Sequence, residues 1–186
     1  MILCGLDIET TGLEWASGHR IIEVALILYK DTGEKLGGFV QRINPERSID
    51  PKAQAVHGIS FDELVMEPTW NIVAPKVCKV LERCDKVVAH NGKGFDQPFL
   101  IHEINRVGLT VPGALYHCID TMVEGRWATP MGKNPNLGEL CFATDTVYEP
   151  EKAHSADYDV LVMMEAYFKA KAWGHFADKS GSELTN

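Results

Sequence analysis

Two carboxylates near the N-terminus, Asp7 and Glu9, are the first residues whose types and spacing could support chemistry. They alternate with the apolar residues Leu6 and Ile8, and this period of two predicts a β-strand. Side chains two positions apart on a strand project from the same face, about 7 Å from each other. Carboxylates held this closely repel each other unless a cation lies between them, so the pair indicates a divalent metal site. With 26 acidic residues in 186, the spacing alone is a weak motif, and other residues must support the site.

A third carboxylate, Asp96, follows a short apolar strand predicted at residues 86–89. A helix is predicted over residues 95–107, and its apolar stripe places Asp96 on the face that packs against the sheet. Asp96 would then point toward the first strand. The alternative is that Asp96 only complements the positive end of the helix dipole. Separately, the alternative for His90 and Asn91, just before the helix, is that they are only hydrogen-bonding residues of a loop.

The third candidate segment lies before the last predicted helix, which runs over residues 156–173. Ser155 has the residue type of an N-cap, so His154 lies in the preceding loop and can reach solvent or substrate. Asp159, at the end of the first turn, shares a stripe with apolar residues and can face inward. Asp157 is the alternative carboxylate, although a first-turn charge favourable to the helix dipole explains it better. A histidine beside an inward-facing acid is a candidate general base.

These segments bring four acids and one histidine to the ends of core elements. Converging carboxylates need counter-charge, and two Mg²⁺ or Mn²⁺ ions would supply it with the oxygen ligands that hard cations prefer. Two metals about 4 Å apart can clamp the attacking and leaving oxygens of a phosphoryl displacement. His154 could then take a proton from the attacking water.

Bulk properties fit one domain, predicted over residues 1–177, followed by a polar tail at residues 178–186. No apolar run is long enough to span a membrane, and no signal peptide is visible. Five cysteines without a Cys-x-x-Cys pair indicate reduced thiols and a cytoplasmic location. The net charge of −8 argues against binding a long stretch of nucleic acid through many phosphates. It allows an enzyme that binds only the end of a nucleic-acid strand.

The predicted order of elements indicates an α/β fold with one mixed sheet and helices on its faces. A meander of three antiparallel strands comes first, followed by alternating helices and strands. Ile22, Val24, Leu26 and Leu28 are predicted to share one face of the second strand, and the segment from 44 to 51 is predicted to be irregular. The predicted strands cover residues 3–9, 21–29, 37–43, 86–89 and 116–119. The predicted helices cover residues 60–66, 73–83 with Pro75 in the first turn, 95–107, 137–142 and 156–173.

Taken together, the motifs resemble the DEDD superfamily of 3′–5′ exonucleases, in its DEDDh subgroup, which includes polymerase III epsilon and RNase T. Asp7-Ile8-Glu9-Thr10-Thr11-Gly12-Leu13 resembles the first exonuclease motif, and His154-x-Ala156-x-x-Asp159 resembles the third. His90-Asn91 with Phe95-Asp96 resembles the second, with three residues between the pairs where two are usual. This longer form is closer to phage-type exonuclease A proteins.

The resemblance implies an RNase H-like five-stranded sheet and release of nucleoside 5′-monophosphates from a 3′ end. It implies that His154 is the general base and that the metal ligands are Asp7, Glu9, Asp96 and Asp159. The substrate-binding residues that it implies are Thr10, Thr11, Gly12, Leu13, Trp15, His90, Asn91 and Phe95. Trp15 could equally pack against the protein, and for Asp120 and His57 structural roles are preferred.

The main hypothesis is therefore a metal-dependent 3′–5′ exonuclease that acts on single-stranded DNA ends, with a replication polymerase as a candidate partner and no membrane association. RNA, including short oligoribonucleotides, is the alternative substrate, because discrimination depends on contacts to the 2′-hydroxyl. The alternative from another class is a non-catalytic nucleotide- or partner-binding module that kept the fold.

Overall fold

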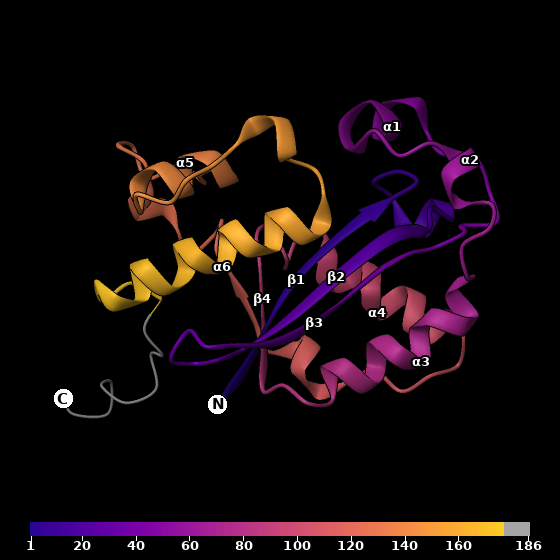
Figure 1. Ribbon diagram of the computed structural model, residues 1–186, viewed down its shortest axis with the longest axis horizontal. Coiled ribbons are helices and arrows are strands. Elements are labelled where there is room, and N and C mark those ends of the chain that lie inside the picture. Colours follow the sequence, from indigo (N-terminus) through magenta and orange to yellow (C-terminus); the bar gives the residue numbers. More distant parts are fainter. Residues whose placement is uncertain (177–186) are drawn as a thin grey trace.

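In the computed structural model, which describes residues 1–176, five strands form one mixed sheet (Figure 1). They are β1 (Ile2–Thr10), β2 (Ile21–Lys30), β3 (Lys35–Arg42), β4 (Lys86–Ala89) and β5 (Cys118–Asp120). Their order across the sheet is β3-β2-β1-β4-β5. β1, β2 and β3 pair antiparallel, whereas β4 is parallel to β1 and β5 is parallel to β4. The predicted fold class, a meander plus two parallel strands, is confirmed.

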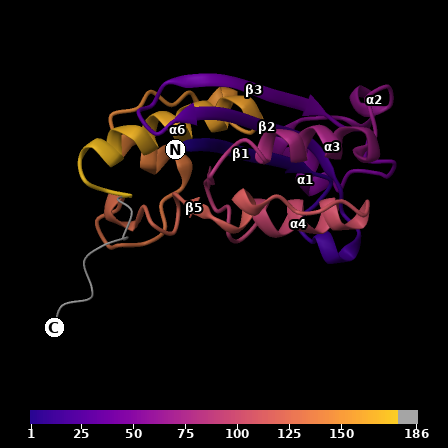
Figure 2. The same cartoon turned by 90° about the horizontal axis from the view of Figure 1, so that it is seen from below.

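Helices cover both faces of this sheet (Figure 2). They are α1 (Pro51–His57), α2 (Phe61–Leu64), α3 (Trp70–Leu81), α4 (Asp96–Arg106), α5 (Leu137–Ala143) and α6 (Ala156–Ala172). α3 and α4 pack with Leu6 and Ile8 of β1, and α6 packs with Leu3 on the other face. The alternating side chains of β1 therefore contribute to two hydrophobic clusters, and β1 is the centre of the molecule.

Gly5 allows α6 to approach the middle of β1. A Cβ atom at this position would lie 2.7 Å from both Met164 Cγ and Val160 Cγ1 of α6. Such a separation is well inside van der Waals contact, so a larger residue would displace the helix. Because α6 also carries Asp159, this close packing sets the distance between the helix and the acids of β1.

The structure corrects the predicted face of Ile22. Ile21, rather than Ile22, joins Val24 in the large hydrophobic cluster, and Ile22 joins a smaller one with Leu64. The cause is a register irregularity near the end of the β1–β2 ladder, which lets two residues of β2 oppose one of β1. An added residue of this kind reverses the face of the side chains beyond it.

The predicted start of the third helix is also wrong, because α3 begins at Trp70 rather than Val73. Trp70 is buried, and its indole Nε1 donates to the carbonyl oxygen of Glu103 at 2.8 Å. Pro75 therefore lies inside the helix and not in its first turn. The carbonyl that loses its partner belongs to Asn71, an exposed residue near the helix start where water can replace the bond.

One helix was missed in the sequence. The predicted irregular segment from 44 to 51 leads directly into α1, because the side chain of Asp50 accepts a hydrogen bond from Lys52 N at 2.8 Å. Pro51 occupies the first helical position, where its missing N–H costs nothing. Gly58 closes the helix in the left-handed conformation, with φ of 72°. These are ordinary helix signals, and α1 could have been predicted from them.

The fifth strand is shorter and lies later than predicted, because a short 3-10 turn at Gly113–Tyr116 occupies the start of the predicted range 116–119. Its last residue is Asp120, which the shift places at the carboxyl end of the strand. The other element ends differ from prediction by one or two residues, as fraying ends commonly do.

The predicted tail at residues 178–186 lies outside the described residues, and the predicted single domain over residues 1–177 stays a prediction. In residues 1–176, no helix has the length and apolar character needed to cross a membrane. All five cysteines are buried free thiols, and a cytoplasmic location stays a prediction.

Candidate active site

Asp7 and Glu9 lie on the half of β1 that extends beyond its partner β4. The β1–β4 ladder covers only Leu3–Gly5, so this edge of β1 is open at the two acids. Both residues belong to the same alternating set as Leu3 and Gly5, which faces α6. The strand therefore presents two carboxylates side by side toward the start of α6.

Asp96 closes the open edge of β1. It is the first residue of α4, its side chain is buried, and its Oδ1 accepts a hydrogen bond from Ile8 N at 3.1 Å. The predicted inward position of Asp96 is confirmed, and the carboxylate lies beside the strand that carries the other two acids. The loop before α4 is held by Asp120, whose carboxylate accepts from the main-chain nitrogens of Asn91 at 3.1 Å and Lys93 at 2.9 Å. Asp120 thus has the structural role that was preferred for it.

His154 and Asp159 approach from the other side of β1, at the start of α6. The main-chain nitrogen of His154 donates to Asp159 Oδ2 at 3.0 Å. Asp159 Oδ1 is buried and lacks a hydrogen-bond partner among residues 1–176. One ligand atom each from Glu9, His154 and Asp159 lies within 4.8 Å of the others. The structure therefore brings the predicted acids and histidine together.

Burial raises the pKa of every acid in the cluster, and repulsion from other acids of the cluster adds to the shift of Asp7 and Glu9. Burial is the larger cause for Asp7, and repulsion from Asp96 and Glu9 adds to it, so its pKa lies well above the usual value. Burial and the charge of Asp159 raise the pKa of Glu9 to about 8. Burial raises the pKa of Asp96 to about 7, although hydrogen bonds from main-chain N–H groups oppose the shift, and burial also raises the pKa of Asp159.

This cluster fits a divalent cation by its donor chemistry. Carboxylate oxygens are the ligands that Mg²⁺ and Mn²⁺ prefer, and the unpartnered Oδ1 of Asp159 offers one without breaking an existing hydrogen bond. Burial and neighbouring negative charges both disfavour ionisation of Asp7 and Glu9, and a bound cation would offset both effects.

Two cavities meet at the cluster. The first has a volume of about 530 Å³ and is lined by Asp7, His90, His154 and Asp159, together with Met122, Asn136 and Tyr148. The second has a volume of about 520 Å³, with Glu9 in its wall. Asp7 thus lines the first cavity and Glu9 the second. An extended ligand that occupied both cavities would pass over these carboxylates.

Four of the predicted substrate-binding residues line the second cavity: Thr10, Gly12, Leu13 and Phe95. The side chain of Leu13 is 76% exposed, so it is free to contact a ligand there. Their contact with substrate stays a prediction.

Thr11 does not fit its predicted role, because it is fully buried. Its hydroxyl lies 3.0 Å from His19 Nδ1 and accepts a hydrogen bond from Arg20 N at 3.0 Å. This threonine holds the chain after β1 in place and leaves no side-chain surface for substrate. Trp15 packs against His102 of α4 with ring centroids 4.9 Å apart, which is the packing alternative that the sequence left open.

His90 lines the first cavity, but both of its ring nitrogens are engaged. Nε2 lies 3.1 Å from the carbonyl oxygen of Pro135, which can only accept, so Nε2 carries the proton. Nδ1 lies 3.0 Å from Thr121 Oγ1. His90 therefore braces the segment 121–135 against the end of β4. Asn91 adopts a left-handed conformation with φ of 67°, so it shapes the loop through its main chain.

The sequence missed several wall residues because it missed α1. Lys52, Val56 and His57 all line the second cavity and all belong to that helix. His57 had been given a structural role, and its Nδ1 does accept a hydrogen bond from Ile59 N at 3.0 Å. The helix-start signals at Asp50 and Pro51 would have placed this wall correctly.

A mixed sheet with buried acids at its open edge, beside two cavities, is the arrangement of a metal-dependent nuclease. The sequence model of the RNase T family, described as exonucleases, matches residues 4–167, and the chain belongs to this family. The predicted resemblance is thus confirmed, and the protein is a 3′–5′ exonuclease of a family that depends on divalent metals.

Similar curated proteins include DNA polymerase III subunit epsilon of Rickettsia conorii, which is 33% identical over 87% of this chain and 70% of its own length. The subunit of the same name from Escherichia coli is 29% identical over 87% of this chain and 68% of its own length. Among solved structures, the E. coli exonuclease I–ssDNA complex superposes with a TM-score of 0.80 at 19% identity. That match covers 92% of this chain but only 40% of exonuclease I, so it supports the fold.

Proposed function

We propose that the chain removes nucleotides one at a time from the 3′ end of single-stranded DNA, with Asp7, Glu9, Asp96 and Asp159 holding two divalent cations. The observation that carries this proposal is the convergence of four acids from β1, α4 and α6, with one buried oxygen of Asp159 that has no hydrogen-bond partner within residues 1–176. A binding module has no need for such an uncompensated cluster, because each buried charge opposes folding.

Each residue of the cluster has a role that follows from its place. Asp7 and Glu9 form a rigid base because both lie on the central strand, and Asp96 is aligned by its hydrogen bond to Ile8 N. Asp159 completes the cluster from α6. Divalent cations bound there would polarise the phosphodiester and favour ionisation of the attacking water.

His154 is suited to accept a proton from that water. Its side chain is exposed in the loop before α6. One of its ring nitrogens lies within 4.8 Å of a carboxylate oxygen of Glu9 and of Asp159. A positioned histidine of this kind typically contributes about 10²–10⁴-fold to the rate of a hydrolysis. The main-chain bond to Asp159 holds the residue in place and leaves its imidazole unconstrained.

The second cavity would hold the terminal nucleotide. Leu13 and Phe95 supply apolar surface for a base, and Thr10 and Gly12 follow directly after the acids of β1. A net charge of −8 favours contact with few phosphates, as expected for an enzyme that grips only a chain end. The likeness to a polymerase subunit further supports a replication polymerase as partner, which co-purification of the two proteins would test.

The test is a degradation assay with matched DNA and RNA oligonucleotides, each labelled at the 3′ or the 5′ end and incubated with Mg²⁺, Mn²⁺ or EDTA. The proposal predicts immediate release of a mononucleotide from 3′-labelled single-stranded DNA and a shortening ladder from 5′-labelled DNA, both abolished by EDTA. Faster loss of RNA would assign the enzyme to RNA. Intact substrates under every metal condition would favour a binding module.

A further inference from the structure

A fifth acid, Glu23, lies beside the proposed metal cluster and is not part of it. Glu23 is directly opposite Glu9 in the β1–β2 ladder, and only 7% of its surface is exposed. Side chains directly opposite in an antiparallel ladder share a face, with Cβ atoms about 5 Å apart. A buried carboxylate at this distance from an acid cluster would add to the repulsion unless other groups hold and neutralise it.

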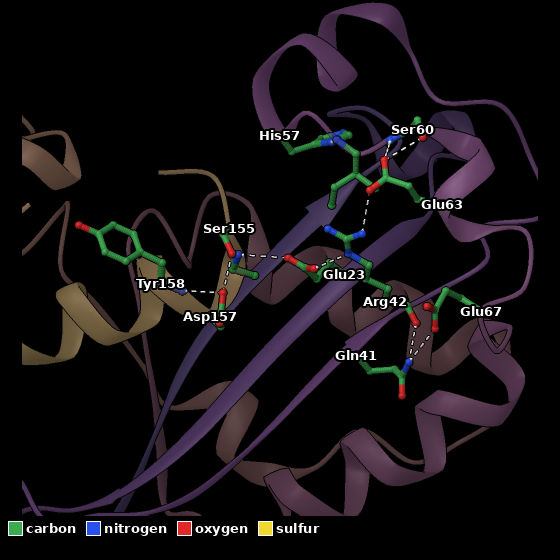
Figure 3. Close-up of polar contacts among 12 residues, drawn as sticks. Glu23, Gln41, Arg42, His57, Ser60, Glu63, Glu67, Ser155, Asp157 and Tyr158 are labelled. Carbon is green, nitrogen blue, oxygen red and sulfur yellow. Dashed lines mark hydrogen bonds and ion pairs between the residues drawn. The ribbon is translucent and has the colours of Figure 1, made fainter. Parts of the chain in front are cut away.

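Both oxygens of Glu23 have partners (Figure 3). Oε2 accepts a hydrogen bond from the main-chain nitrogen of Ala156 at 3.2 Å, and Oε1 accepts one from Arg42 Nε at 3.1 Å. Ala156 is the first residue of α6, where the unpaired N–H groups of a helix favour a carboxylate. Glu23 therefore caps the helix that carries Asp159.

Ser155, the residue expected to cap α6, makes a different hydrogen bond. Ser155 occupies the N-cap position of α6, but its hydroxyl donates to Asp157 instead of accepting from the helix (Figure 3). Ser155 therefore holds the predicted N-cap position without making a capping hydrogen bond through its side chain. The first N–H of α6 is satisfied by a carboxylate 133 positions away in the sequence, on the strand next to β1.

Arg42 extends the contact from Glu23 to α2. Its NH1 group lies 3.0 Å from Glu63 Oε1 in α2, and Glu63 in turn accepts from Ser60 N at 2.8 Å. The chain of contacts runs from α2, through β3 and β2, to the start of α6 (Figure 3). It joins the α1–α2 segment, which lines the second cavity through His57, to the start of the helix that carries Asp159 and directly follows the loop with His154.

We propose that Glu23 is a positioning residue for the exonuclease reaction: by holding Ala156 N–H it places His154 and Asp159 against Glu9. The ion pair with Arg42, at 3.1 Å, partly offsets the charge that Glu23 adds beside Glu9. A direct role for Glu23 as a metal ligand is disfavoured, because its two oxygens already hold Ala156 and Arg42. The inference rests on the proposed function, since it concerns the placing of groups that the function requires.

The test compares three variants with the wild-type enzyme on 3′-labelled single-stranded DNA at saturating Mg²⁺. Glu23→Ala removes both contacts, whereas Glu23→Gln keeps an oxygen that can accept from Ala156 N–H. Glu67→Ala is the matched control, because Glu67 accepts a hydrogen bond of 3.1 Å from Gln41, beside Arg42 on β3, and this contact does not lead to α6 (Figure 3). Hydrogen exchange of the Ala156 amide is measured in the same proteins.

Glu23→Ala is expected to lower kcat by about 10²-fold, the usual result of a displacement near 1 Å, while KM changes less than about twofold. Exchange of the Ala156 amide should accelerate by about five- to tenfold, which corresponds to loss of an ordinary helix cap. Glu23→Gln should stay within about tenfold of wild-type kcat because the acceptor is retained. Glu67→Ala should match the wild type in both measurements.

Three results would each overturn the inference. They are a wild-type kcat in Glu23→Ala, a change in Glu23→Ala that affects only KM, and a loss of kcat in Glu67→Ala equal to that in Glu23→Ala. If the wild-type protein degrades no substrate, the proposed function fails, and amide exchange still decides the positioning role. Unchanged exchange at Ala156 in Glu23→Ala would then show that Glu23 does not hold the helix start.

Discussion

The main-chain nitrogen of His154 donates a hydrogen bond of 3.0 Å to Oδ2 of Asp159, five residues further along the chain. His154 reaches this position through a left-handed conformation with φ of 63°. The bond aligns one oxygen of Asp159 through the backbone and leaves the other, Oδ1, unpartnered among the described residues. His154, in the loop before α6, and Asp159, in the helix, are therefore coupled through the main chain, and the imidazole of His154 can be removed without losing this hydrogen bond.

Replacing His154 separates proton transfer from metal binding. His154→Gly relieves the left-handed φ of 63° because glycine adopts this region freely, whereas His154→Ala keeps a Cβ there, as the wild type does. Both variants lack the imidazole, so kcat should fall by about 10²–10⁴-fold in each, with little change in Mg²⁺ affinity. Steady-state kinetics and a calorimetric Mg²⁺ titration check this. Wild-type kcat in His154→Gly would rule out a general base at this position.

Asp159→Asn keeps an oxygen for His154 N–H but removes one negative charge from the cluster. We expect its metal-free form to be more stable than the wild type, because the variant no longer buries a charge that also opposes ionisation of Glu9. Activity should fall by at least about 10²-fold, since preorganised charge is lost from the site. Thermal unfolding in EDTA and the degradation assay provide the two measurements, and a less stable metal-free variant would contradict the repulsion.

The stability of the metal-free protein should decrease as pH rises. The pKa of Glu9 is raised from 4.5 to about 8 and that of Asp96 from 3.8 to about 7, so the folded state holds these protons more tightly than the unfolded state. Their contribution to stability is therefore complete below the unfolded values and is lost as pH rises through about 7 to 8.

Thermal unfolding in EDTA between pH 5.5 and pH 8.5 checks this prediction, and about 1 kcal/mol corresponds to about 2–4 °C in Tm for a chain of this size. Glu9→Gln serves as the control because it removes one of the titrating groups, and it should flatten the decrease. Equal pH slopes for Glu9→Gln and the wild type would show that Glu9 does not titrate in this range. Added Mg²⁺ should raise Tm more at the higher pH.

Gly5→Ala tests whether α6 must approach β1 closely. The new Cβ would lie 2.7 Å from Met164 Cγ and Val160 Cγ1, so overpacking should cost about 1–3 kcal/mol of unfolding free energy. Activity should fall as well, because the displaced helix carries Asp159. Gly113→Ala is a control, since the added Cβ there has nothing within 4 Å. Denaturant unfolding measures the stability of both variants. Wild-type stability in Gly5→Ala would contradict the close packing of α6 on β1.

The sequence predicted the acid cluster because strand and helix periods are local properties. A period of two placed Asp7 and Glu9 on one face, and a helical stripe placed Asp96 inward, as the structure confirms. Thr11 was predicted wrongly because its burial depends on His19 and Arg20, which return to it from a loop.

Glu23 was missed for a related reason. A carboxylate within an apolar strand gives no indication that its partner is a helix start 133 residues later. Pairing across the sheet and the approach of α6 are long-range properties, and residue spacing in one chain does not reveal them. By contrast, α1 could have been predicted from Asp50 and Pro51 alone.

Calorimetric titration of the metal-free protein with Mn²⁺, run beside Asp7→Asn, tests the central claim most directly. Because the pKa of Glu9 is raised to about 8 and that of Asp96 to about 7, cation binding near neutral pH should displace protons, and the measured heat should depend on the ionisation enthalpy of the buffer. The account predicts Mn²⁺ binding with proton release in the wild type and a loss of about tenfold or more in affinity in Asp7→Asn. Absence of Mn²⁺ binding in the wild type, or equal binding by the two proteins, would contradict it.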